Sequence, residues 1–116
     1  MTGLRALVEA VREARAKYDE RRKFDSNGMA SERWRLEVIM RERALATALL
    51  STPDVLAAVE AIGALGEARA GQTAVRMNWR DGTEGHRERV AADQRAADAR
   101  DDLFRLADRL AAREEG

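Results

Sequence analysis

The chain has 116 residues, with 21 basic and 21 acidic side chains, a formal net charge of zero and no cysteine. Its length fits one domain, and 45% hydrophobic residues with no net charge argue against intrinsic disorder. The absence of cysteine excludes disulfides, thiolate metal sites and thiol catalysis. The most apolar stretch, residues 55–65, is too short to span a membrane, and the charged N-terminal residues do not resemble a signal peptide. We therefore expect a cytoplasmic protein without membrane attachment.

The composition favours helix throughout, because alanine, leucine, arginine and glutamate dominate it. We predict an all-α fold, a small bundle of three to four helices forming a single domain over residues 1–116. Coiled-coil-like seams are expected on the first and last helices. The helices are expected at about residues 3–24, 31–50, 53–70 (extending as far as 80) and 84–113.

The first predicted helix, residues 3–24, carries one apolar stripe at steps of three and four residues. The stripe consists of Leu4, Leu7, Val11, Ala14 and Tyr18, with Val8 beside it. The sequence after it, residues 25–28, is typical of a turn, in which Gly28 can adopt a left-handed conformation.

The second predicted helix, residues 31–50, has Ser31 as its expected N-cap and is apolar on two sides. One face consists of Trp34, Val38, Leu45, Ala48 and Leu49; the other consists of Leu36, Ile39, Ala46 and Leu50. A helix of this kind usually lies between neighbours. Arg41 and Arg43 fall within these faces, so each must reach solvent or a carboxylate.

The third predicted helix starts at the strongest boundary signal in the chain, Thr52-Pro53-Asp54. Residues 55–65 are apolar nearly all round, which predicts the most buried helix of the protein. In residues 75–79 apolar and polar side chains alternate, which is typical of a strand, but no second strand follows. This stretch is either a continuation of the helix, which we prefer, or an extended connector.

The fourth predicted helix, residues 84–113, carries a two-position heptad seam. Its members are Ala92, Ala96, Ala99, Leu103, Leu106 and Leu110. Its first half consists of alanines, whose small side chains contribute little to a hydrophobic core, so the seam is a candidate contact with a partner helix. The sequence leaves open whether it packs within one chain or between chains.

No arrangement of residues indicates catalysis or a cofactor. His86 lacks further ligands at helical spacing, so we expect no metal site. Carboxylates gather on the last helix, where interleaved arginines such as Arg105, four residues after Asp101, are expected to neutralise them. If the protein were an enzyme, Glu60, or Glu37 near Arg41, would be the first carboxylates to consider. We expect that it is not one.

One basic stretch contains an interleaved aromatic residue and could bind phosphates and stack a base. Its residues are Arg76, Trp79, Arg80, Arg87 and Arg89. Acidic side chains lie among them, so nucleic-acid binding through this patch is the alternative. The apolar seams favour a non-enzymatic helical interaction, assembly or adaptor protein, whose partner is another protein or a second copy. Accessory factors of bacteria and phages often have this general appearance.

Overall fold

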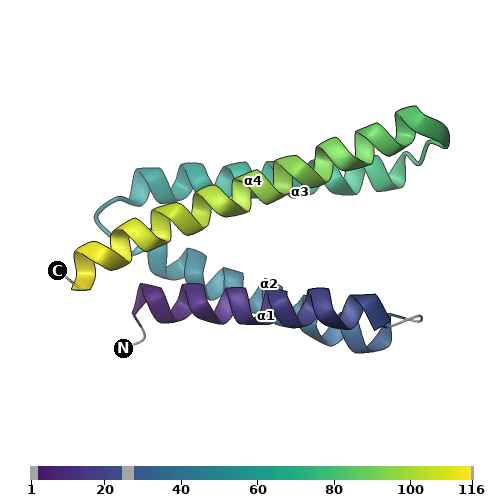
Figure 1. Cartoon of the computed structure of the whole chain (residues 1–116). Helices are drawn as coiled ribbons and strands as arrows, with labels where there is room; N and C mark the ends of the chain where they lie inside the picture. The colour runs from purple at the N-terminus through teal and green to yellow at the C-terminus, as the bar shows by residue number, and fades with distance from the viewer. Residues whose placement is uncertain (1–2, 25–27, 116) are drawn as a thin grey trace. The chain divides into compact units, whose positions relative to one another are not determined.

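The computed structural model describes residues 3–24 and 28–115, without the side chains of Met29 and Ala30. Within these ranges the fold is all-α, with four helices and no strand (Figure 1). They are α1 (Leu4–Phe24), α2 (Met29–Leu50), α3 (Val55–Met77) and α4 (Gly82–Glu115). The predicted fold class is confirmed, and residues 72–77 continue the third helix.

The chain divides into two compact units, and each is described separately. The first contains residues 1–54 and 107–116, so it combines α1 and α2 with the end of α4. The second contains residues 55–106, which are α3 and the longer part of α4. The single-domain organisation stays a prediction.

In the first unit, α1 and α2 form an antiparallel hairpin (Figure 1). Arg41 Nη1 on α2 donates a 2.9 Å hydrogen bond to the carbonyl oxygen of Ala10 on α1. Lys17 Nζ lies 4.7 Å from the ring centre of Trp34. The two contacts are seven residues apart on each helix in opposite directions, which defines the antiparallel register.

The core of the first unit follows the predicted stripes of α1 and α2. On α1, Val8 is fully buried while Leu7 and Tyr18 are half-buried, so the buried stripe is rotated slightly from the predicted one. On α2, the buried apolar side chains are Val38, Leu45 and Leu49. The predicted apolar face containing these three is therefore the one that faces the core.

Helix α2 begins two residues earlier than predicted, and Ser31 is not its N-cap. The cap position is Gly28, which adopts the expected left-handed conformation with φ of 76°. Ser31 lies inside the first turn, and its hydroxyl donates to the carbonyl oxygen of Gly28 at 3.2 Å. The other residues of the predicted turn, 25–27, lie outside the described residues.

In the second unit, α3 and α4 run side by side in opposite directions (Figure 1), and Gln72 Nε2 donates to Asp93 Oδ1 at 2.8 Å. The prediction that α3 is the most buried helix is wrong. Only Ala58 and Leu65 are buried on it, whereas Leu56 is 79% exposed. The apolar character of this segment does not lead to burial, because two antiparallel helices cover only one side of each other.

Candidate interaction surfaces

The heptad seam predicted on α4 is covered within a single chain. All six members, Ala92, Ala96, Ala99, Leu103, Leu106 and Leu110, are at most 9% exposed. In this conformation the seam has little surface to offer to a partner helix.

The end of α4, residues 107–115, packs in the first unit, and we call it the α4 tail. Its buried side chains are Ala107, Leu110 and Ala111. The tail is flanked by two ion pairs to α1. Arg5 Nε donates to Glu115 Oε1 at 2.6 Å, and Arg12 Nη2 donates to Asp108 Oδ2 at 3.1 Å.

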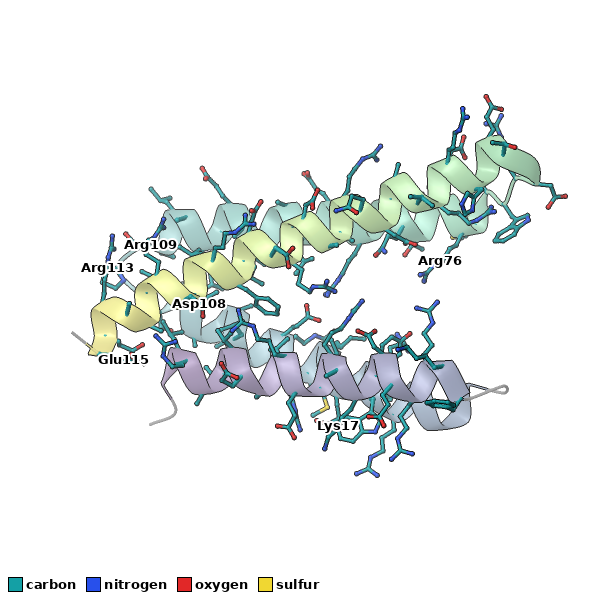
Figure 2. The ribbon with its side chains drawn as sticks, viewed as in Figure 1. Lys17, Arg76, Asp108, Arg109, Arg113 and Glu115 are labelled. Atoms are coloured by element: carbon teal, nitrogen blue, oxygen red, sulfur yellow. The ribbon has the colours of Figure 1, made fainter. Side chains whose placement is uncertain are left out.

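A third ion pair joins the tail to the segment after α2, because Arg113 Nη1 donates to Asp54 Oδ2 at 2.6 Å. Figure 2 labels three of these tail residues, Asp108, Arg113 and Glu115, at the C-terminal end of α4. The hydrogen bond from Arg5 lowers the pKa of Glu115 below its ordinary value of 4.5, and the same bond raises the pKa of Arg5. Hence the tail is bound by buried apolar side chains and an exposed set of complementary charges.

The predicted basic patch is largely engaged with itself. The guanidinium of Arg89 lies 3.9 Å from the ring centre of Trp79 and donates to the carbonyl oxygen of Arg80 at 3.0 Å. Arg80 pairs with Glu88 at 2.9 Å, and the indole N–H of Trp79 donates to Asp81 at 2.8 Å. The remaining members, Arg76 and Arg87, are exposed on α3 and α4 (Figure 2 labels Arg76).

The patch also contains a structurally important residue that is not among those predicted from the sequence, Gly85. Gly85 is buried in the first turns of α4, and a Cβ there would collide with the backbone carbonyl of Arg80. Only glycine lets the connection between α3 and α4 pass this close to the helix. The signal available in the sequence was a glycine inside a predicted helix, which is often a point of close backbone approach.

The carboxylates considered for catalysis occupy ordinary surface positions. Glu60 is exposed, and Glu37 accepts a 3.1 Å hydrogen bond from Arg41, which also donates to Ala10. Arg41 thus finds both a carboxylate and a carbonyl oxygen, as its position among apolar residues required, whereas Arg43 is exposed.

The acidic residues of α4 are partly neutralised, but not by the expected pairing. Arg105 pairs with Asp102 at 2.8 Å rather than with Asp101, and Gln94 donates to Asp98 at 2.8 Å. His86 is exposed. Among residues 3–24 and 28–115, no group of three or more histidine, cysteine, aspartate or glutamate side chains could hold a metal ion.

An exposed apolar stripe on α2 is the clearest surface that remains. Leu36, Met40 and Leu50 are 48%, 63% and 45% exposed. Together with exposed Arg43 and Thr47 they recur at steps of four and three residues along the helix. Both leucines of this group belong to the second apolar face expected for the helix. We call these five residues the α2 stripe.

A smaller exposed apolar group lies at the start of α3, in the second unit. Val55, Leu56 and Val59 are 41%, 79% and 53% exposed. Single exposed apolar side chains are common on protein surfaces, but grouped ones are typical of interaction sites. Both groups come from helices whose apolar sequences predict neighbours on more than one side.

Comparison with known protein families, with curated proteins and with solved structures finds no match to this chain. No helix in the described part of the chain is both long and apolar enough to cross a membrane.

Proposed function

We propose that this protein is a non-enzymatic helical interaction and assembly protein that binds another protein, or a second copy, through the α2 stripe. The single observation that carries the proposal is the exposure of Leu36, Met40 and Leu50 along one side of α2. Keeping large apolar side chains in water costs free energy, which a partner covering them would recover.

The spacing of the stripe supports a helical partner. Steps of four and three residues place side chains along one narrow seam, as in coiled coils and in helices bound in grooves. The polar members Arg43 and Thr47 interrupt the apolar contact. Such interruptions restrict which partner and which register fit.

The proposal is tested by charge substitution in the stripe. Leu36→Glu and Met40→Glu should abolish association, because each would bury a carboxylate against apolar surface. Val90→Glu is the matched control, since Val90 is also apolar and 52% exposed but lies on α4. Light scattering after size exclusion measures self-association, and affinity capture from the native lysate measures other partners.

The proposal would be contradicted if the wild-type chain is monomeric at all concentrations and the Met40→Glu variant captures the same proteins as the wild type does. The nucleic-acid alternative has weaker support, because Arg80, Arg89 and Trp79 contact one another and their neighbours. A phosphate would have to compete with these contacts.

A further inference from the structure

The contact between the α4 tail and α1 has a defined register. Arg5 and Arg12 lie seven residues apart on α1, and their partners Glu115 and Asp108 lie seven residues apart on α4 in the opposite direction. This is the pattern of two antiparallel helices whose flanking charges form successive pairs. The surface of α1 is therefore complementary to one particular helical sequence.

The tail contributes few large side chains to this contact. Of its buried residues, two are alanines and one is Leu110. The three ion pairs join groups whose side chains are between 38% and 64% exposed. Exposed pairs of this kind contribute little stability but do select among partners. The tail is thus bound specifically, without the extensive burial that would make the contact permanent.

The course of the chain allows the tail to leave its own hairpin. The chain passes from the first unit to the second through the non-helical segment 51–54, which contains Pro53, and returns as the continuous helix α4. Segment 51–54 is the stretch of chain that links the hairpin to the second unit. A short segment of this kind is the usual hinge when identical elements are exchanged between copies.

We propose that the α1·α2 hairpin is a docking surface for the α4 tail of a second copy, so that two chains associate by exchanging tails. Charge complementarity identifies the occupant, because the tail of any copy carries Asp108 and Glu115 opposite Arg12 and Arg5. Exchange preserves both ion pairs between the tail and α1, and concentration then shifts the equilibrium toward the dimer. This route of self-association goes beyond the proposed function, because it does not use the α2 stripe.

The test uses two complementary charge-reversed chains. The first carries Arg5→Glu and Arg12→Asp, so its hairpin and its own tail are both acidic at these positions. The second carries Asp108→Arg and Glu115→Arg, so both are basic. Neither chain can form the ion pairs between positions 5 and 115 and between positions 12 and 108, either alone or with a copy of itself. When the two different chains exchange tails, both ion pairs form again on each hairpin.

Both chains also carry Met40→Glu, which removes association through the α2 stripe, so this result is separable from that of the proposed function. A chain with all four charge reversals, in which the pairs re-form internally, shows whether the substitutions allow folding. The matched control mixes Asp102→Arg with Arg105→Asp, because that exposed pair lies within α4 outside the tail. Native mass spectrometry counts the chains of each kind.

We expect the complementary mixture to double its mass and to contain one chain of each kind, while each of these chains alone keeps the mass of a single chain. The control mixture keeps the Arg5–Glu115 and Arg12–Asp108 pairs, so it should form mixed pairs and like pairs without preference. Recovery of folded structure only on mixing, seen by circular dichroism, would support the proposal equally. If the four-reversal chain folds and the complementary mixture forms no mixed dimer, the exchange is wrong.

Discussion

Replacing Gly85 with alanine should destabilise this protein, although the same change inside a helix normally stabilises. Glycine in a helix interior is less favourable than alanine by about 0.5–1 kcal/mol, because glycine loses more backbone freedom on folding. At Gly63 and Gly66, two exposed helical positions, an added Cβ would meet nothing within 4 Å. Alanine at either position should therefore recover that free energy in full.

At Gly85 the added methyl group collides with the backbone carbonyl of Arg80, which cannot rotate away as a flexible side chain would. Overpacking of this kind costs about 1–3 kcal/mol. The connection must shift, and the hydrogen bond from Arg89 to that carbonyl and the Arg89–Trp79 contact are disturbed with it. An exposed cation–π contact adds about 0.5–1 kcal/mol to the loss. The net expectation is a destabilisation of about 1–3 kcal/mol after the helical gain is subtracted.

Urea and thermal unfolding, followed by circular dichroism, measure the difference. One kcal/mol corresponds to a change in Tm of about 4–8 °C for a domain of this size. Gly63→Ala and Gly66→Ala should raise Tm and Gly85→Ala should lower it, with a change in tryptophan fluorescence from Trp79. If Gly85→Ala stabilises the protein as much as the two controls do, the close approach is not a real constraint.

Three further outcomes are expected. Leu45→Ala should lower the free energy of unfolding, measured by urea titration, by about 2–5 kcal/mol, because the Leu45 side chain is fully buried. Leu56→Ala is the control and should change it by less than about 0.5 kcal/mol, because Leu56 is 79% exposed. Because the pKa of Glu115 is lowered in the folded state, its contribution is present above pH 4.5 and is lost as the pH falls through the folded value. Glu115→Gln should therefore flatten the pH dependence of hydrogen exchange in the α4 tail, while Glu114→Gln should not. In gel-shift assays we expect no salt-dependent binding of DNA or RNA, and a shift at low salt that Arg76→Ala weakens would contradict this.

The helices were predictable because their limits depend on local chemistry. Helical periodicity, the turn around Gly28 and the Thr52-Pro53-Asp54 boundary all act within a few residues. The errors at helix starts have the same local origin. Ser31 is a good N-cap residue, but Gly28 offers a left-handed turn that allows the helix to begin earlier, and Ser31 then bonds back to Gly28.

Burial was less predictable, because it depends on what lies opposite each face. The apolar character of residues 55–65 does not say which sides of α3 have a neighbour, and Leu56 and Val59 have little covering them. The α4 seam was identified by residue and is buried as a set. Its assignment to a partner helix could not be decided by periodicity, which is the same for contacts within and between chains.

The balanced charge of the chain acquires a more specific meaning from the α4 tail. Ion pairs within one helix, such as Lys17 with Glu13, stabilise that helix but carry no information about its neighbours. The pairs of Arg5 and Arg12 with the tail differ, because small alanines such as Ala111 pack almost equally well after a shift of one helical turn. Such a shift would place Arg5 opposite Ala111 in one direction, or Arg12 opposite Ala112 in the other, and each loses an acidic partner. The charges therefore select one register that the apolar contact alone leaves undetermined, which is why their reversal is the sharpest test of which chain supplies the tail.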